Sequence, residues 1–216
     1  MSSGPVIIVL AAGLGSRFQD AGHKLSQSLG ATSVLGTTLA QAMASQLPLV
    51  VVTTAALVDE AARHVARQDI VVLEAASGRP IEDRADLRAM NARLGMGASI
   101  AAGVSASSNA SGWLVLPGDM PLLKSSTLQK VAASLRDHPV AYAQYHGRRG
   151  HPVGFSGELY SELINLQGDE GARRLVARYP ADAIEVDDAG VLVDVDTVAD
   201  LAQVRAMWAR AAVAPG

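Results

Sequence analysis

The chain has 216 residues, no cysteine and a formal net charge of -3, and 49% of its residues are apolar. The lack of cysteine excludes disulfides, thiolate nucleophiles and cysteine zinc sites, and it is typical of a reducing compartment, so we expect a cytoplasmic protein. No apolar run reaches the roughly 18 residues of a membrane helix, and the small negative charge gives no basic field for nucleic acid. We therefore expect neither a membrane nor a nucleic acid as a partner.

Short β-branched runs alternate along the chain with longer helical patterns. This alternation predicts βαβ units, and therefore an α/β fold with a mostly parallel sheet and helices on both faces. In chain order we expect strands at residues 6–10, 49–53, 70–73, 113–116, 140–145, 184–186 and 191–195. We expect helices at residues 37–45, 58–67, 99–105, 127–136, 170–178 and 198–211. No internal repeat or linker-like tract interrupts the pattern, which favours a single domain over residues 1–216.

Local signals refine this outline. Ser126 with Gln129 fits a capping box at the start of a helix, and Thr197 with Asp200 resembles one. Residues 188–190 are typical of a hairpin turn between two short strands, which predicts an antiparallel element near the end of the sheet. Residues 75–93 are polar and poorly periodic, so this segment is the best candidate for a mobile loop over a site.

Small residues follow the first predicted strand, in the sequence Ala11-Ala12-Gly13-Leu14-Gly15-Ser16-Arg17. They let the backbone approach a ligand, and successive N–H groups in such a turn bind an anion, so a phosphate chain fits here. Arg17 and Lys24 supply positive charge beside it. The alternative is a tight βα turn with two surface cations. The candidate nucleotide-binding residues in this region are Leu10, Ala11, Ala12, Gly13, Leu14, Gly15, Ser16, Arg17 and Lys24.

Two other kinds of glycine loop are excluded. A dinucleotide-binding fingerprint needs a third glycine, where this chain has Phe18, and an acidic residue at the end of the second strand, where it has Thr53 and Thr54. A Walker A loop needs Gly-Lys-Ser or Gly-Lys-Thr, and neither occurs in the chain.

A carboxylate follows the predicted strand at residues 113–116, in the sequence Pro117-Gly118-Asp119-Met120-Pro121. The carboxyl ends of parallel strands are where open α/β sheets bind their ligands, and the flanking prolines restrict the loop. Asp119 is therefore the leading candidate for a metal ligand, and Gly118 and Asp119 join the nucleotide-binding candidates. The alternative is an ordinary turn aspartate.

Six motifs occur in order along the chain: Leu10-Ala11-Ala12-Gly13-x-Gly15-Ser16-Arg17 with His23-Lys24-Leu25, then Gly95-Met96-Gly97-Ala98-Ser99-Ile100, Pro117-Gly118-Asp119-Met120-Pro121, Gly150-His151-Pro152-Val153, Gly168-Asp169-Glu170-Gly171-Ala172-Arg173 and Asp194-Val195-Asp196-Thr197. With these motifs the chain resembles the molybdenum-cofactor nucleotidyltransferases, the MobA-like family, and specifically the cytidylyltransferase branch often called MocA-like.

The resemblance implies a three-layer, Rossmann-like fold of the GT-A-like nucleotidyltransferase type. It also implies transfer of CMP from CTP to molybdopterin with release of pyrophosphate, Mg²⁺ as cofactor, and a molybdoenzyme as possible recipient of the product. One departure from the family pattern lies between Arg17 and Lys24, where this chain has a longer connection than the family's usual Arg-Met-Gly approach. The register of Lys24 on the phosphates is therefore less fixed than that of Arg17.

Such a transfer brings two polyanions together, so charge neutralisation and positioning carry most of the catalysis and no protein nucleophile is required. Arg17, Lys24 and Asp119 are accordingly the catalytic candidates. Mg²⁺ favours a few carboxylates plus phosphate oxygens, so one acid besides Asp119 suffices. We expect it to be Asp194 or Asp196, which share a face if the last strand continues that far. The alternative for Asp196 is a cap of the final helix.

Three further residues are site candidates. Ser99 is expected near the nucleotide base, and a serine N-cap is the alternative. His151 is a candidate for contact with the acceptor, although a lone loop histidine is more often a surface residue. Arg173 opposite a pterin phosphate is implied by the resemblance, and a solvated helix face is its alternative.

Several functions compete with cytidylyl transfer to molybdopterin. Guanylyl transfer, or transfer to a sugar phosphate, phospholactate or isoprenoid precursor, would use the same phosphate-binding loop and the same metal ligands. A catalytically idle chaperone for a pterin cofactor is a rival from another class, but mere binding does not need a metal-placing carboxylate such as Asp119. Ala12 stands where the guanylyl branch has glycine, so the resemblance favours CTP over GTP.

Overall fold

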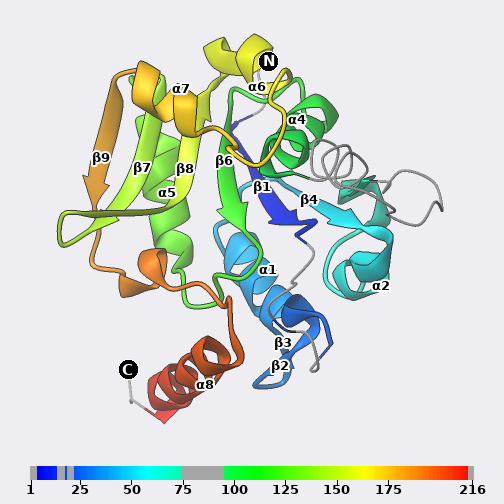
Figure 1. Cartoon of the computed structure of the whole chain (residues 1–216). Helices are drawn as coiled ribbons and strands as arrows, with labels where there is room; N and C mark the ends of the chain where they lie inside the picture. The colour runs from blue at the N-terminus through cyan, green and yellow to red at the C-terminus, as the bar shows by residue number, and fades with distance from the viewer. Residues whose placement is uncertain (1–3, 14–17, 19–21, 74–94, 214–216) are drawn as a thin grey trace.

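The computed structural model describes residues 4–13, 18, 22–73 and 95–213, and the side chains up to residue 210. A seven-stranded sheet has the order β5-β4-β1-β6-β8-β7-β9, and a second, two-stranded sheet is formed by β2 and β3. Helices cover both faces of the large sheet (Figure 1). No helix in these residues is long and apolar enough to cross a membrane.

The strands are β1 (Val6–Ala11), β2 (Ser28–Leu29), β3 (Thr32–Ser33), β4 (Leu49–Thr54), β5 (Ile70–Leu73), β6 (Gly112–Pro117), β7 (Val140–Tyr145), β8 (Arg148–Ser156) and β9 (Ala181–Glu185). The α-helices are α1 (Val34–Ala44), α2 (Val58–Ala61), α4 (Met96–Ala106), α5 (Ser125–Ser134), α6 (Tyr160–Leu163), α7 (Arg173–Arg178) and α8 (Val198–Val213). Short 3₁₀ helices are η2 (Lys24–Ser26), η3 (Ala55–Leu57), η4 (Arg67–Asp69), η5 (Gly157–Leu159) and η6 (Ala189–Leu192).

Strand direction confirms the α/β class and the mostly parallel sheet. β1 pairs in parallel with β4 and β6, β4 with β5, and β7 with β9. β8 runs antiparallel to both of its neighbours, β6 and β7. The expected antiparallel element is therefore present, but it is β8, which forms a hairpin with β7 and lies between β6 and β7 inside the sheet.

The central strands are apolar throughout because both of their faces are buried. Alternate residues of β1 enter two cores: Ile7 and Val9 pack with α1, α5 and α8, whereas Val6 and Ile8 pack with α4, α6 and α7. Burial of both faces fixes the register, since a shift of one residue exchanges the two sets. Because β1 and β6 are parallel neighbours, their carboxyl ends lie at the same edge of the sheet, where the candidate site forms.

The expected strand at residues 191–195 is wrong, and so is the hairpin at residues 188–190. The buried carboxylate of Asp188 accepts a hydrogen bond from the N–H of Gly190 and starts η6, after which residues 193–196 run without strand pairing. Val191 and Val195 are still buried in the core. The alternation of apolar and polar residues in this segment comes from the burial of an irregular stretch of chain. It therefore resembles the pattern of a strand.

The sequence pattern missed β8, which pairs with β6 and β7. Other expected elements differ mainly at their ends: α2 is one turn instead of a helix to residue 67, and β9 begins at Ala181. The expected mobile loop at residues 75–93 lies outside the described residues.

The two capping boxes had opposite outcomes. Thr197 and Asp200 form the predicted box, because Asp200 Oδ2 accepts from the N–H and hydroxyl of Thr197 and the Asp200 N–H donates back to Thr197 Oγ1. The Ser126–Gln129 box is wrong, since Gln129 instead donates to the carbonyl of Ser45. Asp188 replaces it by accepting hydrogen bonds at the start of α5.

Candidate active site

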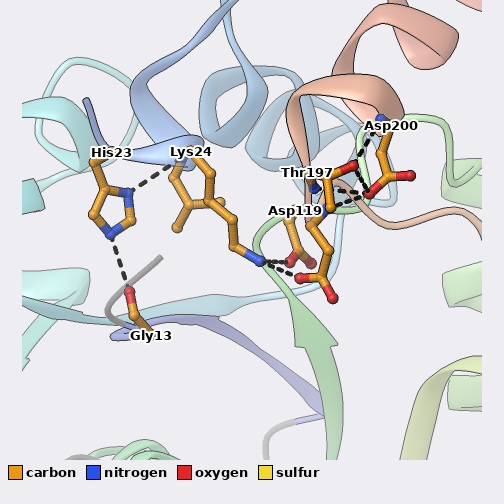
Figure 2. Close-up of polar contacts among 8 residues, drawn as sticks. Gly13, His23, Lys24, Asp119, Thr197 and Asp200 are labelled. Carbon is orange, nitrogen blue, oxygen red and sulfur yellow. Dashed lines mark hydrogen bonds and ion pairs between the residues drawn. The ribbon is translucent and has the colours of Figure 1, made fainter. Parts of the chain in front are cut away.

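An ion-pair cluster joins three distant segments at the carboxyl end of β1 and β6. Lys24 Nζ lies 2.5 Å from Asp119 Oδ2 and 2.9 Å from Asp196 Oδ1. Figure 2 shows the lysine side chain extending from η2 towards Asp119, which follows β6, with the start of α8 beside it. The predicted catalytic lysine and two of the predicted metal ligands are thus in direct contact.

Backbone hydrogen bonds fix the carboxylates. The N–H of Gly118 donates to the carbonyl of Leu10 at 2.9 Å, which holds the β6 loop against the end of β1. A Cβ at residue 118 would lie 3.0 Å from that carbonyl oxygen, so glycine permits the close approach. The N–H of Val195 donates to the carbonyl of Asp119 at 3.0 Å. This bond places the residues on either side of Val195, which are Asp194 and Asp196, next to Asp119.

His23 positions the lysine turn. Its Nδ1 accepts from the N–H of Leu25 and caps η2, while its Nε2 lies 3.0 Å from the carbonyl oxygen of Gly13 (Figure 2). Because Nδ1 accepts, the proton is on Nε2, which donates to Gly13. The ring therefore ties the turn that carries Lys24 to the loop after β1.

The electrostatics of this cluster favour the charged form of Lys24. Burial alone lowers the pKa of Lys24, but the carboxylates of Asp119 and Asp196 outweigh it and hold the pKa above its ordinary value. Desolvation raises the pKa of Asp194, and the negative charges of Asp119 and Asp196 raise it further. The ammonium is thus charged, and three acidic groups are close enough to influence one another.

A cavity of about 490 Å³ opens over this cluster, and we call it the β1 cavity. The N-terminus of α4 forms another wall, and a helix N-terminus favours bound anions. Nine predicted site residues line the cavity: Leu10, Ala12, Gly13, Lys24, Ser99, Asp119, His151, Asp194 and Asp196. Ser99 is buried in the first turn of α4 and donates to the carbonyl of Gly95, which is the N-cap, so the alternative of a serine N-cap is wrong.

The remaining predicted site residues lie elsewhere. Ala11 is fully buried at the end of β1, and Gly118 packs behind the cavity against Leu10. Arg173 is the first residue of α7 and lines a neighbouring cavity. Four residues of the loop after β1, which are Leu14, Gly15, Ser16 and Arg17, lie outside the described residues, so their predicted roles stay predictions.

The neighbouring cavity has a volume of about 390 Å³, and we call it the β8 cavity. Its apolar floor comes from α4, β6 and β8, and two arginines stand at its wall. Met96, His151 and Asp169 line both cavities, so the two spaces meet at these side chains. The residues that give the β8 cavity this character are Ile100, Val115, Val153, Phe155, Arg149 and Arg173.

A bulge in β8 presents His151 at this junction. Between the pairs Tyr142–Val153 and Gln144–Arg149, the three residues from Gly150 to Pro152 lie opposite Ala143 alone. Bulges of this kind re-aim side chains next to sites. Burial lowers the pKa of His151 to about 4, with Asp194 opposing this shift and Arg149 adding to it. The imidazole is therefore neutral at pH 7 and offers hydrogen bonds without charge.

Residues 7–184 match the model of the MobA-like NTP transferase domain. The chain belongs to this family. PucB, a purine catabolism protein of Bacillus subtilis (strain 168), is 30% identical to the chain over 204 residues, which are 92% of this chain and 94% of that protein. The chain is accordingly a nucleotidyltransferase whose substrates include a nucleotide.

Solved structures agree with this assignment. Rv0371c from Mycobacterium tuberculosis H37Rv is similar with a TM-score of 0.76 and 26% identity, and the match covers 94% of this chain and 99% of that one. A complex of Rv0371c with manganese is similar with a TM-score of 0.68 and 25% identity, covering 95% of this chain and 100% of that one. A divalent cation is thus bound by a relative of the same fold.

The described residues of this transferase fit a divalent cation. Asp119 Oδ1 is buried and has no hydrogen-bond partner among them, which is costly for a carboxylate oxygen without a ligand. No group of three or more His, Asp or Glu side chains in the described part of the chain is arranged to hold a metal by itself. A cation here needs oxygens from a bound nucleotide or water as well, which is the coordination that Mg²⁺ favours.

Sequence reasoning gave no individual role to several residues that build the site. His23, Met96 and Asp169 stood inside noted motifs, and the motif positions were their signal. Arg149 stood outside every motif, and only the three-dimensional arrangement reveals it.

Proposed function

We propose that this transferase moves CMP from CTP to a molybdopterin-type acceptor and releases pyrophosphate, with Mg²⁺ as its cation. The observation that carries the proposal is the junction of two unlike cavities at His151. The β1 cavity holds the lysine–carboxylate cluster that a triphosphate and a cation need. The β8 cavity combines an apolar floor with two arginines, which suits a heterocycle that carries negative charge.

CTP occupies the β1 cavity in this proposal. The loop after β1 binds the phosphates through its backbone N–H groups, with Arg17 and Lys24 adding positive charge. The base lies towards the N-terminus of α4 and Ser99, which line the same cavity. Ala12 supports the cytidylyl branch, because its methyl group fills space beside the base and disfavours a larger purine.

The acceptor occupies the β8 cavity, with its ring on the apolar floor and its phosphate towards the junction. Arg173 faces the acceptor at the wall of this cavity. His151 lines both cavities and is neutral, so it donates a hydrogen bond at the junction without adding charge. The two substrates therefore approach each other from opposite sides of one histidine.

In the reaction, an acceptor phosphate oxygen attacks the α-phosphorus of CTP, and the bond from that phosphorus to the bridging oxygen breaks as pyrophosphate leaves. Lys24 exchanges its carboxylate partners for the phosphates and neutralises the leaving group. Asp119, with Asp194 or Asp196, would hold the divalent cation, which supplies further neutralisation of phosphate charge. No protein nucleophile takes part. A molybdoenzyme is the recipient that such a product implies.

The test compares all four ribonucleoside triphosphates. Purified protein is incubated with Mg²⁺, one triphosphate and molybdopterin, and pyrophosphate release is measured while mass spectrometry identifies the dinucleotide. We expect a cytosine dinucleotide as the main product and no release without acceptor. Competition between CTP and GTP at equal concentration then measures the preference.

Ala12→Gly provides the matched variant. One methyl group discriminates by only about 1–3 kcal/mol, so the variant should narrow the preference for CTP without reversing it. A guanine dinucleotide as main product of the unmodified protein would contradict the cytidylyl assignment. Release of pyrophosphate with a sugar phosphate, phospholactate or an isoprenoid phosphate, and none with molybdopterin, would move the acceptor to another class.

A further inference from the structure

Arg149 is a positively charged residue at the wall of the β8 cavity. It lies on β8 two residues before His151 and lines the β8 cavity but not the β1 cavity. Its Cζ stands 5.5 Å from the centre of the Tyr142 ring, on the adjacent strand β7. The tyrosine face thus contacts the guanidinium of an exposed arginine at the wall of the cavity.

The two arginines of this cavity differ from two other arginines of α7, which have ion-pair partners. Arg174 is 2.6 Å from Glu170, and Arg178 is 3.2 Å from Glu162. Within residues 4–13, 18, 22–73 and 95–213, neither Arg149 nor Arg173 forms an ion pair. Two carboxylates also line the cavity: Glu170 is engaged by Arg174, and Asp169 lies at the junction with the β1 cavity. Two exposed arginines at the wall of the cavity are therefore without a carboxylate partner among the described residues.

The apolar floor of the β8 cavity indicates which kind of ligand fits beside the two arginines. Val115, Val153 and Phe155 present apolar surface, which suits a flat ring and not a small hydrated anion. A guanidinium both stacks on flat rings and pairs with carboxylate or phosphate. The combination fits a planar heterocycle that carries an anionic group.

We propose that Arg149, held by Tyr142, is a specificity-determining residue for the acceptor, binding the anionic group of a planar ring in the β8 cavity. This inference rests on the proposed function in one respect, namely that the β8 cavity receives the acceptor. Nucleotide binding in the β1 cavity does not involve Arg149.

Two fluorescent probes test the proposal without turnover. One is 6-carboxypterin, whose neutral counterpart is 6-methylpterin, and the other is 8-anilinonaphthalene-1-sulfonate, an anionic ring that is no pterin. For Arg149→Ala we expect affinity for both anionic probes to fall about tenfold or more, and affinity for 6-methylpterin to fall about twofold or less. CTP affinity, measured by calorimetry, should be unchanged.

Neighbouring residues supply matched controls. Arg148→Ala removes the adjacent exposed arginine of β8, which does not line the β8 cavity, and it should bind every probe as the unmodified protein does. Tyr142→Phe keeps the ring and should also be unchanged, whereas Tyr142→Leu should weaken the anionic probes by about two- to fivefold.

The outcomes separate the two proposals. Equal binding of 6-carboxypterin by Arg149→Ala and the unmodified protein would overturn the role of Arg149 and leave the pterin acceptor standing. Failure of the unmodified protein to bind either pterin, together with arginine-dependent binding of the sulfonate probe, would overturn the pterin acceptor and support Arg149. An equal loss in Arg148→Ala and Arg149→Ala would reduce the effect to general surface charge and overturn the inference.

Discussion

The two cavities handle charge in opposite ways. In the β1 cavity, Lys24 is already paired with Asp119 and Asp196, so in the proposed reaction the lysine must exchange these partners for the phosphates. In the β8 cavity, Arg149 and Arg173 have no ion-pair partner among the described residues, so an anion binds without displacing one. Paired charges suit a site where a cation and a polyanion enter together. Unpaired charges suit a site that recognises an anion alone.

Asp119→Asn should show the largest difference between the two cavities, because it changes turnover but not acceptor-probe binding. Removal of the negative charge takes away the anchor of the cation, a loss of several kcal/mol in the transition state, so turnover should fall about a thousandfold. Binding of 6-carboxypterin in the β8 cavity should not change. Steady-state rates and probe fluorescence decide this, with circular dichroism as the control for folding. Near-normal turnover of a folded variant would exclude Asp119 as the metal ligand.

Lys24→Met tests the exchange of partners. Loss of a charged hydrogen-bond donor to phosphate should weaken nucleotide binding about 10- to 100-fold. Binding of Mn²⁺ without nucleotide should instead become tighter, since no ammonium competes for Asp119 and Asp196. Calorimetry measures both. Lys130→Met, an exposed lysine of α5, is the matched control, and a variant with unchanged nucleotide affinity would place Lys24 away from the phosphates.

Gly150→Ala should disturb both cavities, because it precedes the shared His151. An added Cβ would lie 2.2 Å from the carbonyl oxygen of Val191, so β8 and η6 must move apart. We expect a loss of about 1–3 kcal/mol in the free energy of unfolding, and weaker binding in both cavities. Denaturant unfolding measures the first. Gly13→Ala, where a Cβ meets no atom within 4 Å, is the stability control, and equal stability of both variants would contradict the close packing.

Thr197→Ala should have the smallest effect. It breaks the capping box of α8 at a cost of about 1 kcal/mol, while acceptor-probe binding stays the same. The hydrogen bond from Thr197 holds the pKa of Asp200 below its usual range. A lowered pKa stabilises the fold at pH above the carboxyl's unfolded value, and this contribution disappears as the pH falls through the folded value. The difference between variant and unmodified protein in thermal unfolding should therefore shrink in acid; a constant difference would mean that Asp200 is not involved.

The sequence predicted the parts of the fold that local pattern controls. Strands buried on both faces, such as β1 and β6, are continuous apolar runs, and the loops that follow them carry Gly13 and Asp119. Lys24, Asp119 and Asp196 were all predicted as site residues, and the structure brings them into contact. Motif order was thus enough to predict that these three side chains lie together, while their roles in catalysis stay predictions.

The rest depends on tertiary contacts. β8 begins with Arg148, Arg149 and Gly150, a start with little strand propensity, and pairing with β6 and β7 on both sides overrides it. Asp188 accepts a hydrogen bond from the hydroxyl of Thr127, which lies 61 residues away in the sequence. A pattern of neighbouring residues therefore cannot reveal this contact at the start of α5. The position of Arg149 over Tyr142 likewise exists only once two strands are paired.

The Val195–Asp119 hydrogen bond has a consequence for biosynthesis. Lys24 meets Asp119 across 95 residues and Asp196 across 172 residues of sequence. At about 5–20 residues per second, the ribosome takes roughly 10 to 30 seconds to deliver Asp196 after Lys24. Throughout that interval the emerging chain has the lysine but not the complete carboxylate cluster. In the proposed reaction, the nascent protein thus becomes competent only when the segment before α8 has left the ribosome and the Val195 N–H has reached the carbonyl of Asp119.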